Sequence, residues 1–269
     1  MELSIIILNY NNKNLTKELL KNLTQELNLS FEHEIIVVDN ASYHGIKEIV
    51  EENFPQVRFI QSNKNGGFAY GNNLGIKQAS GKYIMIMNPD LVILSKAIEI
   101  MYQYMENYPE VALAGPRLIN ADKSVQYSCT EFPDWQLPLY RRTSLGNTKA
   151  GKKWLHKYLM KDLNHLNNHL VPALFGACLV IRKSALGKVG LLDEQYFMYM
   201  EDLDWSRRFW AAGYKVAYIG QAEIIHLHRR QSAGENLPKT LFSKTARHHV
   251  ISFIKYLLKF KGKKLPHVS

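Results

Sequence analysis

The first third of the chain alternates short, continuous apolar runs with helix-like segments. The apolar runs cover residues 4–8, 34–39, 57–62 and 82–88, and the first two consist largely of β-branched side chains. Continuous runs of this length are typical of strands covered on both faces, and residues 15–27 between the first two have a helical pattern. Strand-helix-strand alternation predicts a parallel sheet with right-handed crossovers, so we expect an α/β fold.

The rest of the chain continues in strands and helices, with one interruption. Periodicity fades between residues 123 and 169, where we expect an excursion of loops and short helices. Elsewhere the pattern predicts a helix over 95–107 with Ser95 as its N-cap, strands over 111–118, 175–182 and 215–220, a helix over 202–212 that ends at Gly213, and a helix-rich stretch over 237–261.

Size and composition indicate an ordinary globular protein. The chain has 269 residues with 46% hydrophobic content, enough for one large domain or two modest ones. Its two cysteines, Cys129 and Cys178, have no metal-type spacing, so neither a disulfide framework nor a zinc site is indicated. The start lacks a basic n-region, and no window reaches the roughly 18 apolar residues of a membrane span. We therefore expect a cytoplasmic protein.

The net charge of +10 is concentrated in two segments. Residues 141–161 carry seven Lys or Arg and no acid, and residues 229–269 carry ten with the single acid Glu235. This distribution argues against a nucleic-acid binder with one basic face and favours local attraction to anions, such as lipid headgroups. Apolar residues recur at helical spacing in 237–261. We expect this basic amphipathic segment either to lie at the inner face of the membrane or to pack on its own domain.

Two polar clusters follow the first strands, at the sheet edge where open parallel sheets bind ligands. Asp39-Asn40-Ala41-Ser42 closes the second strand, where an Asp can accept hydrogen bonds from a base or ribose, although the same residues also form ordinary turns. Residues 63–76 hold Gly66, Gly67 and Gly71 in a loop that opens a helix. Because Asn72-Asn73 replace the Lys-Ser/Thr of a Walker A loop, this is an amide-rich ligand loop or a simple turn.

Two further clusters carry carboxylates and histidines. Asn88-Pro89-Asp90 ends the strand over 82–88, where a carboxylate can bind a hard divalent cation. The apolar stretch 197–206, FMYMEDLDWS, contains Glu201, Asp202 and Asp204. Carboxylates there either favour the first turn of a helix or gain basicity from apolar surroundings. His226 and His228 face the same way if they lie on one strand, which suits a metal or phosphate contact.

Taken together and in this order, these clusters resemble the inverting glycosyltransferases of family 2, which have the GT-A fold, and in particular the bacterial rhamnosyltransferase-like branch. The resemblance covers residues 1–232 and is collinear. The matching blocks are SIIILNYN, VVDNAS, NKNGGFAYGNNLGI, MNPD, FGACLVIRKSAL, LLDEQYFMYMEDLDWSRRFWAAGY and IIHLH. It divides the chain into a nucleotide-sugar-binding half (1–118), an acceptor and catalytic half (119–236), and the C-terminal helical segment (237–269).

The resemblance implies a role for each matching position. Asp202 would be the catalytic base, with Glu201 beside it. Asp90 and His226 would hold a divalent cation, Mg²⁺ or Mn²⁺, with His228 as an alternative to His226. Gly176 and Trp205 would face the acceptor. The donor pocket would comprise Asn9, Tyr10, Asn11, Asp39, Asn40, Asn65, Gly66, Gly67, Phe68, Asn72, Asn88, Asp90 and Arg229.

The implied reaction moves a sugar from a nucleotide diphosphate to a hydroxyl of a glycan or lipid-linked saccharide in bacterial cell-surface polysaccharide synthesis. The branch favours dTDP-rhamnose as donor, and the same scaffold also accepts UDP-sugars. Two other readings are a nucleotidyltransferase, which should carry a glycine-rich activation loop that residues 9–14 lack, and a non-enzymatic nucleotide or anionic-surface binding module, which rests on the basic segments alone. No nucleic-acid partner is expected.

Overall fold

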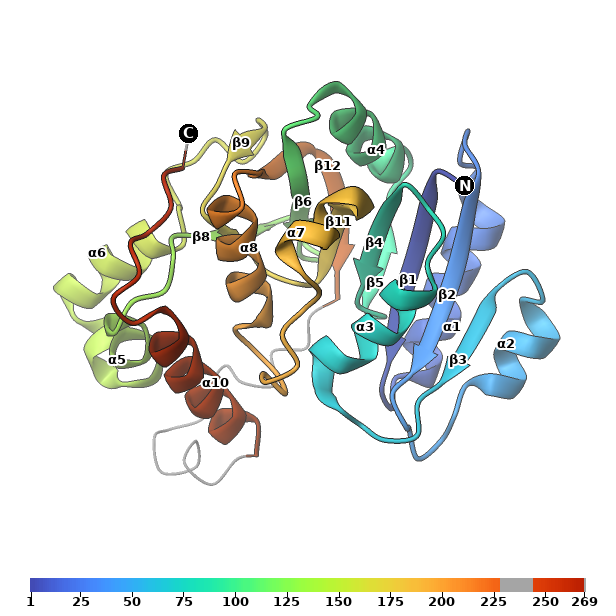
Figure 1. Ribbon diagram of the computed structural model, residues 1–269, viewed down its shortest axis with the longest axis horizontal. Helices are drawn as coiled ribbons and strands as arrows, with labels where there is room; N and C mark the ends of the chain where they lie inside the picture. The colour runs from blue at the N-terminus through green and yellow to red at the C-terminus, as the bar shows by residue number, and fades with distance from the viewer. Residues whose placement is uncertain (228–243, 269) are drawn as a thin grey trace.

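The computed structural model describes residues 1–227 and 244–268, and a mixed sheet forms its centre (Figure 1). The strands of this sheet are β1 (Leu3–Asn9), β2 (His33–Asp39), β3 (Arg58–Gln61), β4 (Tyr83–Met87), β5 (Leu91–Ile93), β6 (Val111–Ile119), β7 (Val125–Gln126), β9 (His169–Leu170), β11 (Cys178–Arg182) and β12 (Lys215–His226). Two short strands, β8 (Cys129–Thr130) and β10 (Ala173–Leu174), pair separately.

The order across the sheet is β3-β2-β1-β4-β11-β6-β12-β5, with β7 beside β6 and β9 beside β12. The first four strands are mutually parallel, as are β6 and β12, while β11 runs antiparallel between β4 and β6. This confirms the expected mostly parallel α/β sheet. Because β11 starts opposite the end of β4, with Cys178 across from Met87, the segment before β11 meets the carboxyl ends of the parallel strands.

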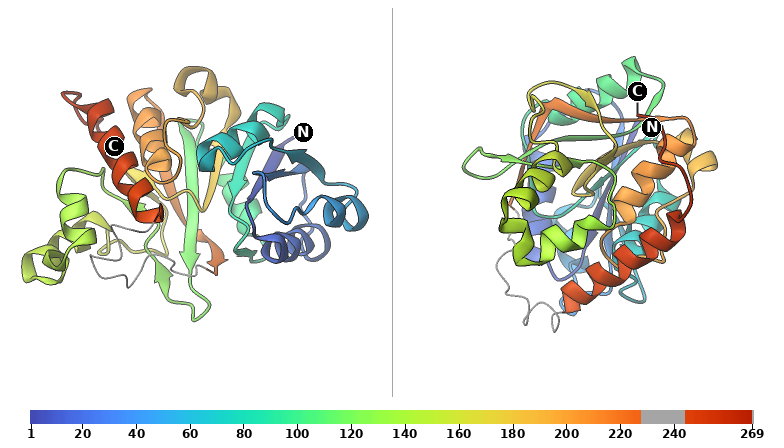
Figure 2. Two further views of the ribbon diagram at one scale, coloured as in Figure 1. Left: turned by 90° about the horizontal axis from the view of Figure 1, so that it is seen from below. Right: turned by 90° about the vertical axis from the view of Figure 1, so that its left-hand side faces the viewer.

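Helices cover both faces of the sheet (Figures 1 and 2). Alternate residues of β1 contribute to two clusters, Ile5 and Ile7 to one and Ile6 and Leu8 to the other, because successive side chains of a strand point to opposite faces. On the first face lie α1 (Lys13–Lys21), α2 (Lys47–Asn53) and α4 (Ala97–Asn107). On the second face lie α3 (Gly67–Gln78), α7 (Leu186–Val189) and α8 (Glu201–Ala211).

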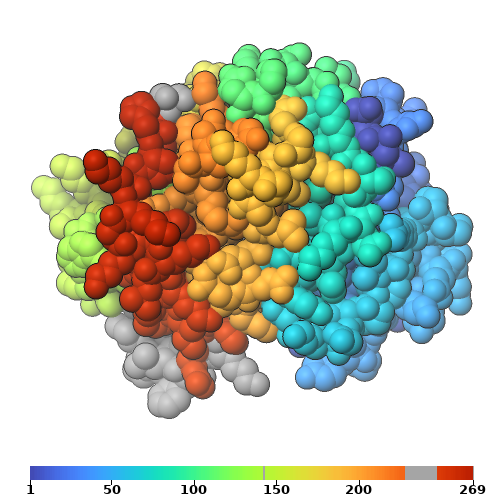
Figure 3. Space-filling model, in the orientation of Figure 1, coloured from blue at the N-terminus to red at the C-terminus, as the bar shows by residue number. Residues whose placement is uncertain are grey.

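A third apolar cluster lies beside the sheet and joins the C-terminal helix to the middle of the chain. It unites α5 (Gln136–Arg142), α6 (Lys149–Tyr158) and α10 (Lys244–Phe260) around Leu137, Tyr158, Phe253 and Tyr256, together with Leu203 of α8. In Figure 3, α10 lies against the surface formed by the chain near residue 200. No helix within the described ranges is long and apolar enough to span a bilayer.

Some elements start or end differently from the sequence prediction. The expected helix over 95–107 begins at Ala97, because Lys96 adopts a left-handed φ of 68° and Ser95 does not cap it. The expected helix over 15–27 is α1 followed by a π-helical turn, Asn22–Glu26. Brief 3₁₀ turns occupy Ser144–Asn147 and Lys183–Ala185.

Strand β12 is longer than predicted, and β5 was not predicted at all. The segments 215–220 and 224–226 form one strand, because a register shift between Ile219 and Glu223 lets β12 continue along β6 instead of turning away. Of the helix expected over 237–261, residues 237–243 lie outside the described ranges, and α10 accounts for the part from Lys244. The proposed division at 118/119 falls within a sheet that runs through both halves.

Candidate active site

The carboxyl ends of β1 and β2 are joined by a network around Asp39. One carboxylate oxygen accepts hydrogen bonds from Asn9 Nδ2 and Ser42 Oγ, both at 2.6 Å, and the other accepts from the Ser42 amide at 3.1 Å and Gln61 Nε2 at 3.0 Å. The Asp39 side chain is fully buried. The nucleobase of a donor could contact this carboxylate directly only by displacing one of these hydrogen-bond donors. In this structure Asp39 links the ends of the strands through its hydrogen bonds.

Asn40 fastens the glycine-containing loop to the end of β2. Its Nδ2 donates to Asn65 Oδ1 at 3.0 Å and to the Gly67 carbonyl at 3.1 Å, and its Oδ1 accepts from the Gly66 amide at 3.3 Å. Asn40 is itself buried. The loop is therefore a fixed surface at the sheet edge and not a free turn.

The most exposed of the predicted donor residues follow the end of β1. Tyr10 is 38% exposed, and Asn11 is exposed with a left-handed φ of 55°. Asn65 is half-buried. Asn11 accepts the Tyr43 amide at 3.0 Å and its own amide donates to Ser42 Oγ at 2.9 Å, so its backbone is held in place. These residues form one part of the accessible surface of the predicted donor pocket, to which the half-buried Phe68, Asn88 and Asp90 also contribute.

The glycine-containing loop also docks onto the segment that carries the proposed base. The Phe68 amide donates to the Phe197 carbonyl at 2.9 Å. Gly67 has a φ of +90°, and a Cβ there would lie 2.0 Å from the same carbonyl oxygen. Asn72 is buried and donates from Nδ2 to the Phe68 carbonyl at 3.0 Å. Phe68 therefore links the predicted donor side to the catalytic segment, and Asn72 binds to Phe68 within α3.

A strained backbone turn precedes α8. Tyr199 and Met200 have φ values of 70° and 71°, a left-handed conformation that costs roughly 1–3 kcal/mol per non-glycine residue. Helix α10 packs against this turn, because Ser252 Oγ donates to the Met198 carbonyl at 2.8 Å and the His249 ring lies 5.0 Å from that of Tyr199. The turn ends at Glu201, the first residue of α8.

Asp202 is held by two backbone amides at the start of α8. Its Oδ2 accepts from Gly176 and its Oδ1 from Leu203, both at 2.8 Å. Burial raises the pKa of Asp202 to about 6, although these hydrogen bonds favour the charged form. Burial thus increases the basicity of this carboxylate, which also lies in the first turn of α8. Gly176, expected to face the acceptor, is buried and positions Asp202 through its amide.

Glu201 is more deeply buried than its neighbour. Its side chain is 5% exposed, and Oε2 has no hydrogen-bond partner among the described residues. Burial, and then the nearby charge of Asp202, raises the pKa of Glu201 well above its ordinary value. This carboxyl group therefore adjoins the proposed base without lying on an accessible surface.

Asp204 and Trp205 of this helix are fully buried and contact other parts of the protein. Asp204 is fully buried, accepts from Arg208 Nε at 2.7 Å and forms an ion pair with Lys259 of α10. Arg208 follows Asp204 by four residues, so the two side chains meet on one face of the helix. Trp205 is also fully buried, with its indole donating to the Gly190 carbonyl at 3.0 Å. The expected acceptor contact by Trp205 is thereby corrected: its indole packs in the core.

Asp90 and His226 meet at the end of the sheet. His226 Nε2 lies 3.3 Å from Asp90 Oδ1, and the Leu227 amide donates to the Asp90 carbonyl at 2.8 Å. Two ligands of one octahedral ion, each bonded at about 2.1 Å, lie about 3 Å apart, so this carboxylate and imidazole fit a divalent cation. In the part of the chain that the structure describes, no group of three or more His, Cys, Asp or Glu could hold a metal. Remaining ligands would be substrate oxygens or water.

The base and the cation pair belong to the same edge of the sheet. The Asn88 amide donates to the carbonyl of Ala177 at 2.9 Å, and Gly176, which binds Asp202, immediately precedes Ala177. Arg229 and His228, two further predicted site residues, lie outside the described residues. Sequence reasoning missed Gln61 and Gln126. Neither is part of a recognisable motif, and Gln126 falls where periodicity fades.

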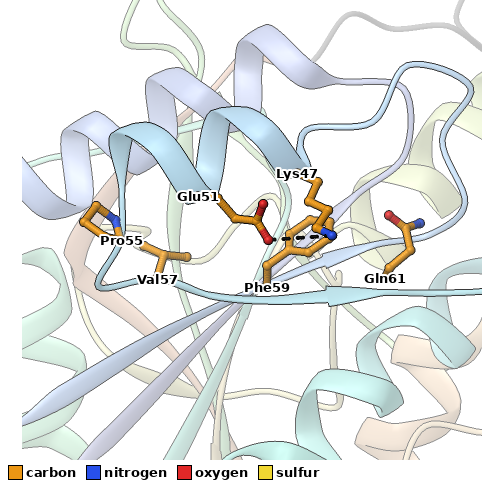
Figure 4. Close-up of a pocket in the computed structure, with 6 residues that line it drawn as sticks. All are labelled: Lys47, Glu51, Pro55, Val57, Phe59 and Gln61. Atoms are coloured by element: carbon orange, nitrogen blue, oxygen red, sulfur yellow. Dashed lines mark ion pairs between the residues drawn. The ribbon is translucent and has the colours of Figure 1, made fainter.

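A shallow hollow lies along the outer edge of the sheet (Figure 4). It has a volume of about 520 Å³ and is lined by Lys47, Glu51, Pro55, Val57, Phe59 and Gln61. Lys47 and Glu51 form an ion pair of 3.7 Å at its rim. Of the lining residues, Gln61 is the one that contacts the strand-end network, so this hollow borders the donor side and lies apart from Asp202.

Comparison with known proteins identifies the class. A model of the family described as Glycosyl transferase family 2 matches residues 4–190. The chain therefore belongs to this family and is a glycosyltransferase. It is 29% identical over 234 residues to the N-acetylglucosaminyl-diphospho-decaprenol L-rhamnosyltransferase of Mycobacterium tuberculosis, covering 82% of this chain and 73% of that protein. It is 26% identical over 265 residues to rhamnosyltransferase WbbL of Escherichia coli K12, covering 94% and 91%.

Solved structures share the fold at low sequence identity. GalNAc-T7, crystallised with UDP, GalNAc and Mn²⁺, matches with a TM-score of 0.69 at 12% identity. The match covers 98% of this chain, which spans about half of that protein (48%). The mannosyltransferase PcManGT of Pyrobaculum calidifontis, in complex with GDP-Man and Mn²⁺, matches with a TM-score of 0.62 at 16% identity, covering 98% of this chain and 66% of that one. The fold is thus GT-A.

Proposed function

We propose that this glycosyltransferase moves rhamnose from dTDP-rhamnose to a hydroxyl of a lipid-linked saccharide, with inversion at the anomeric carbon. The observation that carries the proposal is the half-buried carboxylate of Asp202, whose pKa is raised to about 6 and which two amides hold near the Asp90–His226 pair. The names of the M. tuberculosis and E. coli relatives support rhamnose, and the former supports a lipid diphosphate acceptor.

In the proposed mechanism Asp202 accepts the proton of the acceptor hydroxyl. The acceptor oxygen forms a bond to the anomeric carbon as the bond from that carbon to the diphosphate oxygen breaks, and the nucleoside diphosphate leaves. One base opposite the leaving group inverts the anomeric configuration, because no second carboxylate forms a covalent intermediate. A divalent cation held by Asp90 and His226 would neutralise charge on the diphosphate. Tyr10, Asn11 and Asn65 are accessible candidates for donor contacts.

The donor and the cation can be tested together by thermal shift. We expect dTDP to raise the melting temperature when Mn²⁺ or Mg²⁺ is present, and to have little effect without it. UDP and GDP serve as comparison nucleotides, and a UDP-specific shift would reassign the donor within the same class. Rhamnose transfer by the wild type, followed by NMR of the anomeric product, then tests inversion. Stabilisation by none of these nucleotides would contradict the proposed function.

We further propose that the outer face of α10 lies on an anionic membrane, where a lipid-linked acceptor would be met. The inner face of α10 packs on the rest of the domain through Phe253 and Tyr256, which agrees with the alternative that this segment packs on its own domain. The outer face leaves four aliphatic side chains 44–66% exposed, namely Val250, Ile251, Ile254 and Leu258. Exposed cations stand at both ends of this stripe, Arg247 before it and Lys261 after it.

Helix α6 also carries exposed cations. Lys152, Lys153 and Lys157 are exposed, and α6 shares the third apolar cluster with α10. Exposed aliphatic residues bordered by cations suit the boundary between anionic headgroups and acyl chains. The outer face of α10 therefore combines exposed apolar area with positive charge, and α6 adds cations within the proposed acceptor half.

Vesicle sedimentation tests this surface. The wild type should bind vesicles that contain phosphatidylglycerol more strongly than vesicles of phosphatidylcholine alone. The double variant Ile254→Asp/Leu258→Asp should lose most of this binding, because two charges replace the exposed stripe. Leu166→Asp is the matched control, since Leu166 is 60% exposed away from α10 and its change should leave binding intact. Equal binding by the double variant and the wild type would contradict the proposal.

A further inference from the structure

Gln126, the last residue of β7, lies across β6 from His226. Strand β6 pairs with β12 on one side and with β7 on the other, so that Leu118 lies opposite both Ile224 and Gln126. His226 is the last residue of β12, just past the end of this paired region. The topology therefore brings the Gln126 side chain to the histidine of the cation pair.

The amide of Gln126 has a determined orientation. Its Nε2 donates to the backbone carbonyl of His226 at 2.8 Å and to Asn120 Oδ1 at 2.7 Å. A backbone carbonyl can only accept a hydrogen bond, so this contact identifies the nitrogen of the amide. The oxygen, Oε1, lies 2.9 Å from His226 Nδ1 and must be the acceptor there.

This orientation selects one tautomer of the His226 ring. Since Oε1 accepts, Nδ1 carries the hydrogen, and in the neutral ring the lone pair is on Nε2. Nε2 is the nitrogen that lies 3.3 Å from Asp90. The ring therefore presents its lone pair toward the carboxylate with which it would share a cation.

A short turn holds Gln126 in this position. The Asn120 amide donates to the Ser124 carbonyl at 2.8 Å, and Asn120 Nδ2 donates to Ser124 Oγ at 2.7 Å. Ser124 Oγ in turn donates to Asp122 Oδ1 at 2.6 Å. Asn120 then accepts the Gln126 amide, so the whole hairpin between β6 and β7 supports the contact with His226.

From these contacts we infer that Gln126 is a positioning residue for the divalent cation: it holds His226 in the Nδ1–H tautomer and aims Nε2 at the ion beside Asp90. The inference rests on the proposed function, which requires the cation. Hydrogen bonds to the second nitrogen of a ligating histidine fix the ring and its tautomer, and their loss typically weakens metal binding about 10–100-fold.

The test compares Gln126→Leu and Gln126→Glu with the wild type. Mn²⁺ affinity is measured by electron paramagnetic resonance with dTDP present, and the tautomer of His226 by ¹⁵N NMR without metal. Gln126→Leu should weaken Mn²⁺ binding at least tenfold. Gln126→Glu retains an acceptor for Nδ1–H but loses the donor to the His226 carbonyl and to Asn120 Oδ1, so it should recover part of the affinity. Gln221→Leu, at an exposed glutamine of β12, is the control and should behave as the wild type.

The outcomes separate this inference from the proposed function. A wild type that binds no Mn²⁺ overturns the cation of the proposed function and the inference with it. Mn²⁺ binding that is equally tight in Gln126→Leu overturns only the role of Gln126. If Gln126→Leu fails to fold, the wild-type NMR spectrum still decides, because a hydrogen on Nε2 instead of Nδ1 contradicts the inference.

Discussion

Asp202 Oδ2 accepts the backbone N–H of Gly176 at 2.8 Å, and this contact ties the proposed base to the donor side of the site. A Cβ at Gly176 would lie 3.3 Å from both Asp202 Cβ and the tip of the Phe68 ring. Phe68 in turn donates its amide to Phe197. The start of α8 and the glycine-containing loop therefore form one packed unit, so displacing the backbone of either should affect both donor binding and transfer.

The rate of transfer should depend on pH through Asp202. Burial raises the pKa of this carboxyl to about 6, and a general base acts only when it is ionised. We expect kcat to rise about tenfold per pH unit below pH 6 and to level off above it. Steady-state rates with saturating donor between pH 5 and 8 check this. A kcat that is constant across pH 6 would contradict it.

Replacing Glu201 should stabilise the fold at neutral pH. Its pKa is raised in the folded state, so its contribution to the free energy of unfolding is fully present below pH 4.5 and is lost as pH rises. Glu201→Gln removes this loss, and its melting temperature should exceed that of the wild type increasingly above pH 4.5. Glu48→Gln, at an exposed glutamate of α2, should produce no such trend. A difference that is independent of pH would refute the assignment.

Lys259 should stabilise the attachment of α10. Its Nζ lies 2.6 Å from Asp193 Oδ2 and also pairs with Asp204, which is fully buried. Lys259→Met leaves the buried Asp204 with Arg208 as its one charged partner among the described residues, and we expect the free energy of unfolding to fall by about 2–3 kcal/mol. Urea denaturation measures this change. Lys261→Met, at an exposed lysine just past the helix, is the control, and equal effects of the two changes would count against the role of Lys259.

Gly67 should tolerate no side chain. It has a φ of +90°, and its Cβ would lie 2.0 Å from the Phe197 carbonyl oxygen. Gly67→Ala should therefore lower stability by more than about 1 kcal/mol and weaken dTDP binding by displacing the loop. At Gly187 of α7 a Cβ would meet no atom within 4 Å, so Gly187→Ala should be neutral. Calorimetric titration with dTDP and Mn²⁺ distinguishes the two, and unchanged binding by Gly67→Ala would disprove the coupling.

The sheet was predictable because its strands are covered on both faces. Residues such as Ile5 and Val37 are fully buried, and strands of this kind appear in a sequence as continuous apolar runs. The clusters at the strand ends were predictable for the same reason, since a run that stops at Asp39 or Met87 marks where the carboxyl edge lies. Strand β5 escaped prediction because three residues, Leu91–Ile93, are too few to show a period.

The environment of each site residue could not be predicted, because it depends on contacts distant in sequence. Trp205 lies only three residues after the proposed base, a spacing that places side chains near one face of a helix, yet its indole is fully buried in the second core cluster. Asp39 looked accessible at a strand end, and Gln61 from β3 helps to enclose it. Gln126 meets His226 across 100 residues of chain, and no local pattern encodes that pairing.

The most direct test of the account is the Asp202→Asn variant. Asn preserves the size of the side chain but cannot accept the acceptor's proton, so rhamnose transfer to a lipid-linked saccharide should fall by about 10²–10⁴-fold. Binding of dTDP with Mn²⁺ to this variant, measured by calorimetry, should stay close to that of the wild type. The control Asp162→Asn changes an exposed aspartate and should keep both dTDP binding and rhamnose transfer at the wild-type level. Transfer by Asp202→Asn at the wild-type rate would remove Asp202 from the role of base.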